Sequence, residues 1–164
     1  MQNKPMSDKV RGYLFVTAQF ALLGALMLPG GKNWPVELWL RVTSWVFIGV
    51  GLVLILVAGL NLGKSLTANP VPLAKAQLKT TGLYAVVRHP IYLGLLVLAA
   101  GMTAGSGSVL HIVFAAALFA ILNFKAAFEE RLLRAKFAEY AEYAAKVGRL
   151  LPRLFGRHLP KGIQ

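Results

Sequence analysis

Three long stretches of the chain carry no Asp, Glu, Lys or Arg, and they set its pattern. They cover residues 13–31, 42–63 and 91–124, which are 19, 22 and 34 residues long. A helix needs about 20 apolar residues to cross the hydrocarbon core of a bilayer, so each of the first two stretches predicts one spanning helix. The third is too long for one such helix, and its middle reads Gly-Ser-Gly-Ser at 105–108, a strong turn signal. We therefore expect a helical hairpin there, over about 90–104 and 109–128.

A helical period continues beyond the last apolar stretch. Between 125 and 151, apolar side chains recur at steps of three and four residues, at Phe128, Leu132, Leu133, Phe137, Tyr140, Ala144, Val147 and Leu151. This spacing predicts a long amphipathic continuation of the fourth helix, lying near the membrane surface and ended by Gly148 and Pro152. The predicted fold is a single all-α domain over 1–164, a polytopic membrane protein with four transmembrane helices and a C-terminal amphipathic cytoplasmic helix.

Charge gives this fold an orientation and a surface partner. The 164-residue chain holds 18 Lys and Arg against 6 Asp and Glu, and 57% of its residues are hydrophobic. With four spans, 16 basic residues fall on one side and two on the other, which places both termini in the cytoplasm. The basic residues flank apolar spans instead of forming one basic domain, which indicates anionic membrane lipids as partners and no nucleic acid. There are no cysteines and three scattered histidines, so we expect no metal site.

Polar side chains gather where the third apolar stretch begins. Within 82–94 stand Tyr84, Arg88, His89 and Tyr92. Ionisable groups at a membrane boundary cost free energy unless they are solvated or bind something. Interfacial anchoring by Tyr, Arg and His is the simpler alternative, but it does not explain a proline fixing the helix start directly after a histidine. We favour a ligand site over pure anchoring.

Two adjacent glutamates follow about 40 residues later and differ in their neighbours. Glu130 has Arg134 four residues on, in the favourable order for an exposed ion pair. Glu129 has leucines at the corresponding positions, so its carboxylate lies on a partly apolar face and needs a partner or a ligand. Lys125, one turn earlier, is one candidate partner, and the hydroxyls of a bound ribose are the alternative. Tyr140 and Tyr143 are expected to pack rather than to bind a ligand.

Together these residues resemble a known family. The run Gly82-Leu83-Tyr84 … Arg88-His89-Pro90-Ile91-Tyr92-Leu93-Gly94, followed by Glu129-Glu130 and then Phe137 … Tyr140 … Tyr143 … Arg149 … Pro152, is similar to the isoprenylcysteine carboxyl methyltransferase and phospholipid methyltransferase family. The resemblance covers a motif-bearing core of about 62–152, over half of the chain. It implies a small prokaryotic-type enzyme of the cell (inner) membrane with its active site on the cytoplasmic side.

The resemblance also implies a cofactor and its site. Members transfer a methyl group from S-adenosyl-L-methionine, leaving S-adenosyl-L-homocysteine, without a Rossmann domain; this chain likewise has no Gly-x-Gly-x-x-Gly after a strand. By the same resemblance the cofactor is held by Gln77, Leu78, Lys79, Tyr84, His89, Pro90, Ile91, Tyr92 and Glu129, and catalytic roles fall to Lys125, Arg88 and Glu130. The carboxylate of the cofactor suits Arg88, His89 or free N–H groups at the helix start, and aromatic rings suit the adenine and the sulfonium.

The acceptor is predicted as a lipophilic small molecule or lipid. Prenylcysteine enzymes of the family place an arginine one helical turn before the first glutamate, where it serves the substrate carboxylate, and Lys125 occupies that place here. Lysine pairs with a carboxylate without the planar fork of arginine, so a carboxylate on a lipophilic acceptor is the simplest expectation. The alternatives are a phospholipid-type N-methyltransferase, a sterol-reductase-like NADPH enzyme, and a non-catalytic protein anchored to anionic lipid.

Overall fold

The chain folds as a set of long helices joined at one end by a folded loop region. The computed structural model describes residues 7–73 and 77–153, and within these ranges the secondary structure is helical apart from an isolated bridge between Val87 and Gly148. The helices are α1 (Asp8–Met27), α2 (Leu38–Leu62), η1 (Gly63–Ser65), η2 (Gly82–Ala85), α3 (Pro90–Ser106), α4 (Val109–Lys136) and α5 (Tyr140–Lys146).

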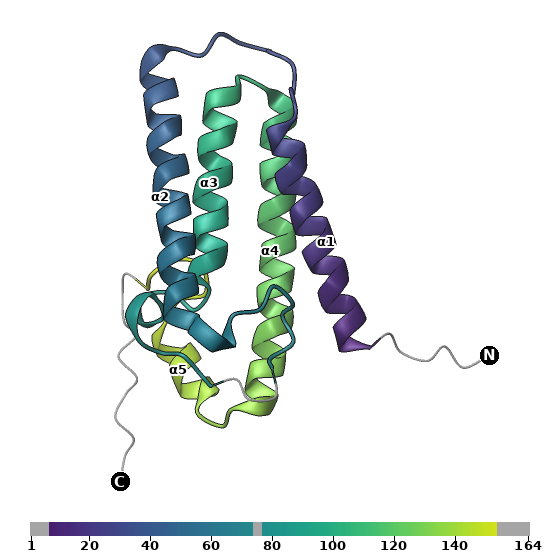
Figure 1. Ribbon diagram of the computed structural model, residues 1–164, viewed down its shortest axis with the longest axis vertical. Helices are drawn as coiled ribbons and strands as arrows, with labels where there is room; N and C mark the ends of the chain where they lie inside the picture. The colour runs from purple at the N-terminus through teal and green to yellow at the C-terminus, as the bar shows by residue number, and fades with distance from the viewer. Residues whose placement is uncertain (1–6, 74–76, 154–164) are drawn as a thin grey trace, which may run out of the picture.

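The long helices lie roughly parallel or antiparallel to one another (Figure 1). α2 packs along α3, α3 along α4, and α4 along α1, which leans away from the others toward its N-terminal end. The segment between α2 and α3, together with α5, folds over one end of the bundle (Figure 1). Most of the predicted site residues line a cavity at this end.

Small residues allow α2 and α3 to approach closely. The Ser44 hydroxyl donates a hydrogen bond of 2.7 Å to the Gly101 carbonyl oxygen across the pair. A Cβ at Gly51 would lie 2.7 Å from the backbone nitrogen of Leu98, so a larger residue there would force the helices apart. Such small-residue contacts are how helices associate where no hydrophobic driving force acts between them.

The predicted hairpin is confirmed, with longer arms than expected. α3 and α4 are separated by a turn in which Gly107 has φ of 63°, the left-handed conformation that glycine adopts at least cost. α3 ends two residues later than predicted, and α4 runs from Val109 to Lys136 instead of ending near residue 128.

Three helices are long and apolar enough to cross a membrane, by length and composition. These are α1, α2 and α4, and α3 is a shorter apolar helix of 17 residues. The predicted polytopic all-α membrane class is therefore supported through three of its four expected spans.

The expected single amphipathic helix over 125–151 is wrong. α4 ends at Lys136, Phe137 is extended with φ of −122° and ψ of 115°, and the chain turns back before α5 begins at Tyr140. Neither proline nor glycine marks this break. Packing decides it, because the reversal buries Tyr140 to 1% exposure and brings residues 147–149 beside Val87, Arg88 and His89.

Candidate functional site

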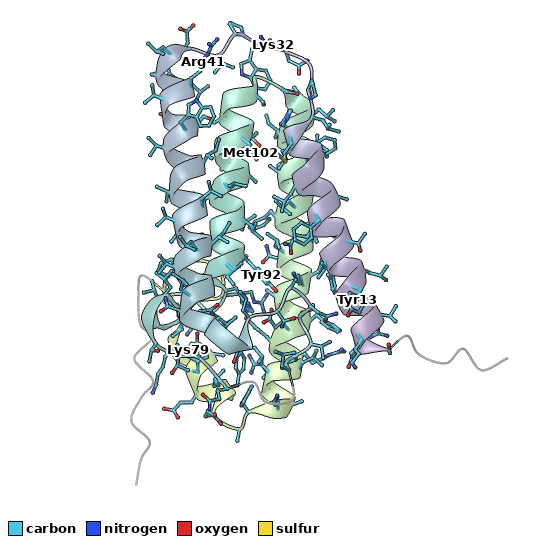
Figure 2. The ribbon with its side chains drawn as sticks, in the orientation of Figure 1. Tyr13, Lys32, Arg41, Lys79, Tyr92 and Met102 are labelled. Carbon is cyan, nitrogen blue, oxygen red and sulfur yellow. The ribbon has the colours of Figure 1, made fainter. Side chains whose placement is uncertain are left out.

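A cavity of about 500 Å³ opens at the looped end of the bundle, where α3 begins. Its walls come from α1, α2, the loop residues 65–72 and 77–79, η2, α3, α4 and the segment around α5. Figure 2 shows Tyr92 on α3 and Lys79 in the loop at this end of the molecule. The volume falls in the range of about 300–1,000 Å³ that is usual for small-molecule and cofactor sites. All the predicted site residues except Pro90 and Glu130 line it.

Glu130 is not among the residues that line the cavity, and it is buried against two arginines and a histidine. Its Oε1 accepts hydrogen bonds from Arg88 Nε (3.0 Å) and Nη2 (2.8 Å) and from Arg149 Nε (3.0 Å), and His89 Nε2 lies 3.2 Å from the same oxygen. Its Oε2 accepts a bond of 3.0 Å from Arg149 Nη2. The carboxylate therefore ties together three side chains from two distant parts of the sequence.

The predicted exposed ion pair between Glu130 and Arg134 is wrong. Glu130 shares the buried face of α4 with Leu122 and Ala126, eight and four residues earlier. Arg134 is exposed, with its guanidinium carbon 5.7 Å from the centre of the Tyr140 ring. Glu130 lies on the face of α4 that is turned to the interior, where two arginines pair with it, and these buried charge-assisted bonds are stronger than an exposed pair four residues apart.

The guanidinium of Arg88 makes hydrogen bonds to several groups inside the protein. Besides Glu130, its Nη1 donates to the carbonyl oxygens of Ala144, at 2.9 Å, and Val147. The adjoining backbone is paired as well, since Arg88 N bonds to Gly148 O (2.8 Å) and His89 N to Arg149 O (3.1 Å). Arg88 is thus placed to position the C-terminal segment and Glu130, and it also lines the cavity, so its predicted catalytic role stays a prediction.

Arg149 also belongs to this cluster, although it was not among the predicted site residues. It belongs to the C-terminal part of the motif, but its distance in sequence from Glu130 gives no sign of contact. Its hydrogen bonds to Glu130 raise the pKa of its guanidinium further above the usual value, so it is a fixed cation.

Glu129 presents its carboxylate to the cavity. Its Oε2 accepts a hydrogen bond of 2.6 Å from the Tyr92 hydroxyl, and His89 Nδ1 lies 3.7 Å from the same oxygen. The His89 and Tyr92 rings stack with centroids 5.1 Å apart and planes 5° from parallel. Within the described residues Oε1 has no partner, and the side chain is 27% exposed. One oxygen is therefore held by the protein while the other is available to a ligand.

Lys125 lies deeper, against α1. Its ammonium donates a bond of 2.7 Å to Gln19 Oε1 and lies 5.0 Å from the centre of the Tyr92 ring, with only 2% of the residue exposed. No direct ion pair joins Lys125 to Glu129 in the described part of the chain, although the charge of Glu129 still acts on the ammonium through space. The direct contact expected between these two side chains is therefore not formed.

Tyrosines complete the cavity wall on the side of α5. Tyr143 donates a bond of 2.6 Å to the Tyr84 carbonyl oxygen, whereas the buried Tyr140 hydroxyl has no partner within the described residues. Burial raises the pKa of Tyr143 to about 12 and also raises those of Tyr84 and Tyr140, so all three phenols stay neutral near pH 7. The expectation that Tyr140 and Tyr143 only pack missed their place in the cavity wall.

The cavity as a whole suits a ligand with hydroxyl groups and positive charge. Among the described residues it offers the unpaired Oε1 of Glu129 and the aromatic rings of Tyr84 and Tyr92. A carboxylate accepts hydrogen bonds from hydroxyl groups, and aromatic faces attract cations. Across the described ranges no group of three or more His, Cys, Asp or Glu could hold a metal ion.

Comparison with known proteins places this geometry in context. The model of the phospholipid methyltransferase family matches residues 39–140, which run from α2 to the start of α5. Methanethiol S-methyltransferase 2 of Bradyrhizobium diazoefficiens is 43% identical over 83 residues. The matched stretch is 48% of this chain and 30% of that protein, so the chain spans well under two thirds of this relative. α1 and the segment 141–153 lie outside the family match.

Proposed function

The chain belongs to the phospholipid methyltransferase family, and we propose that it methylates a lipophilic acceptor at the membrane surface with S-adenosyl-L-methionine as methyl donor. The observation that carries the proposal is the meeting of Glu129, His89 and Tyr92 with Lys125 in one cavity at the end of an apolar bundle. Ionisable side chains at membrane depth are costly, and a ligand site accounts for their presence.

The residues of the cavity fit this cofactor. The unpaired oxygen of Glu129 is suited to ribose hydroxyls, and the Tyr84 and Tyr92 rings to the adenine and the positive charge. α3 begins at Pro90 with no side chain capping its first N–H groups, which suits the carboxylate of an amino acid. Residues 77–79 also line the cavity.

Positioning and exclusion of water are the tasks of these residues. When bound, the cofactor supplies an electrophilic methyl group for in-line displacement by the acceptor atom. Tyr92, whose ring stacks on that of His89, holds Glu129 by a hydrogen bond, and Glu130, itself held by Arg88, contacts His89. Side chains held in this way lower the activation barrier of methyl transfer by keeping the reacting atoms aligned. Lys125 and Gln19 stand on the α1 side of the cavity, which we assign to the acceptor.

Three acceptor atoms are compatible with this reaction. The family name points to the amine of a phospholipid, the motif resemblance to a carboxylate, and the relative from Bradyrhizobium diazoefficiens to a thiol. The buried ammonium of Lys125 favours an acceptor that is anionic when it reacts, as carboxylates and thiolates are. We therefore place the carboxylate and the thiol ahead of the phospholipid amine.

Titration calorimetry on the purified protein tests the cofactor. We expect S-adenosyl-L-homocysteine to bind with one site per chain, because it carries the ribose, adenine and amino-acid groups that the cavity fits. NADPH serves as the control, because a sterol-reductase-like enzyme would bind it. Binding of NADPH without S-adenosyl-L-homocysteine would refute the methyltransferase proposal, and binding of neither would favour a non-catalytic protein.

We further propose that all four long helices cross the membrane. In this topology Ser7 and α5 both lie on the cytoplasmic side. α3 has 17 residues, about 26 Å at about 1.5 Å per residue, and it is flanked by α2 and α4. Lys32 and Arg41 stand at the end of the bundle opposite Lys79 (Figure 2). With four spans, the side of Lys79 carries 16 basic residues and the side of Lys32 and Arg41 carries only these two. An excess of basic residues is typical of the cytoplasmic side.

The absence of natural cysteine makes this topology directly measurable. Single variants Ser7→Cys, Lys32→Cys and Glu139→Cys place a thiol at exposed positions on the two sides. We expect a membrane-impermeant maleimide to label Lys32→Cys in intact cells, and the other two only after the membrane is opened. Labelling of Ser7→Cys and Glu139→Cys on opposite sides would rule out four spans.

A further inference from the structure

Gln19 is a buried polar residue in a wall of the cavity, formed by α1, that the family match does not cover. It stands on α1, is 6% exposed and lines the cavity beside Phe20. An amide buried in an apolar spanning helix costs free energy unless its hydrogen bonds are made. Only one of them is made within the described residues, from Lys125 Nζ to Gln19 Oε1 at 2.7 Å.

Because Lys125 donates to the amide oxygen of Gln19, this bond uses none of the amide N–H donors of Gln19 and only one N–H of Lys125. An ammonium only donates, so the amide must turn its oxygen to Lys125 and keep its Nε2 for another partner. Neither Gln19 Nε2 nor the remaining N–H bonds of Lys125 have partners in ranges 7–73 and 77–153. Both residues line the same cavity. Apart from the Tyr92 ring, over which the ammonium lies, and the charge of Glu129, the pair is therefore a group of hydrogen-bond donors with one positive charge and no hydrogen-bond partner beyond each other in the described ranges.

We propose that Gln19 and Lys125 together bind the anionic head of the acceptor, a carboxylate or a thiolate carried on an apolar body, and that α1 thereby sets acceptor specificity. This rests on the proposed methyl transfer. Charge-assisted hydrogen bonds from an ammonium and an amide suit an anionic oxygen or sulfur. A protonated amine would meet a like charge and no free acceptor on the pair, so the same arrangement selects against it.

Holding α1 in place does not require this pair. Phe15 packs its ring 5.7 Å from that of Phe128, Arg131 Nη2 bonds to Asp8 Oδ1 at 3.1 Å, and Asn69 Nδ2 bonds to the Lys9 carbonyl oxygen. Two apolar residues in place of Gln19 and Lys125 would dock the helix without desolvating a charge. The polar pair is better explained by what it presents to the cavity.

Binding of four matched six-carbon ligands to the full chain in lipid nanodiscs tests the proposal without relying on turnover. The ligands are hexanoate, 1-hexanethiol, 1-hexanol and hexylamine, titrated in the presence of saturating S-adenosyl-L-homocysteine. We expect hexanoate or hexanethiol to bind at least about tenfold more tightly than hexanol, with hexylamine weakest. The better of the first two identifies the head as carboxylate or thiolate.

Two substitutions separate recognition from packing. Gln19→Leu removes the amide donor and should weaken binding of the preferred ligand about tenfold. Gln19→Glu keeps the contact between α1 and Lys125 and neutralises the charge, so it should weaken that binding more strongly while leaving the Tm unchanged. Both variants should bind S-adenosyl-L-homocysteine as the unmodified chain does.

Three results would overturn the inference. They are equal binding of hexanol and of both anionic candidates to the unmodified chain, unchanged binding of the preferred ligand by Gln19→Glu, or tighter binding of hexylamine than of the others. Failure of S-adenosyl-L-homocysteine to bind the unmodified chain would instead count against the proposed function, so the two failures are distinguishable.

Discussion

Replacing Glu130 with glutamine should lower the free energy of unfolding by about 3–5 kcal/mol, the usual cost of removing one member of a buried ion pair. The substitution keeps the shape of the side chain but leaves Arg88 and Arg149 without their shared carboxylate. Arg88 is the costlier of the two, since its side chain is 8% exposed against 39% for Arg149. Reversible unfolding in mixed micelles measures the change.

An exposed glutamate supplies the matched control. Glu142 pairs with Lys146 at 2.6 Å, and both side chains are about 70% exposed, so Glu142→Gln should leave the stability nearly unchanged. Arg88→Met should be more harmful than Arg149→Met for the reason of burial given above. Equal stabilities for Glu130→Gln and Glu142→Gln would contradict the description of Glu130 as the anchor of the C-terminal segment.

Much of this fold follows from local sequence rules. The uncharged stretches predicted the long helices, and the Gly-Ser-Gly-Ser run predicted the turn at Gly107, because both signals depend on neighbouring residues only. The motif from Tyr84 to Tyr92 and Glu129 were also predicted to meet, and they line one cavity. That meeting was implied by resemblance to a family, since nothing in their spacing states it.

The errors arise where tertiary contacts outweigh local rules. Glu130 satisfies the spacing of an exposed pair with Arg134, yet its partners come from residues 88, 89 and 149, which no local pattern reveals. The reversal at Phe137 has no breaker residue and is stabilised by the burial of Tyr140. Gln19 lies alone in an apolar helix, and only the approach of α1 to α4 gives it a partner.

The largest expected effect on ligand binding comes from Glu129→Ala. This change removes the carboxylate oxygen that we assign to the ribose hydroxyls, and it frees the Tyr92 hydroxyl from its bond of 2.6 Å. A hydrogen bond to a charged group contributes about 1.5–3 kcal/mol, so affinity for S-adenosyl-L-homocysteine should fall about ten- to a hundredfold. Calorimetry with the same ligand gives the dissociation constant directly.

Tyr92→Phe and Glu139→Ala make the result specific. Tyr92→Phe keeps the carboxylate but releases Oε2, so the affinity should fall by less than in Glu129→Ala. Glu139 is exposed and lies outside the cavity, so Glu139→Ala removes a charge from the same end of the molecule without touching the site. We expect its affinity to match the unmodified chain. An equal loss in Glu139→Ala and Glu129→Ala would mean that the effect is one of overall charge, whereas unchanged affinity in Glu129→Ala would remove this carboxylate from the cofactor site.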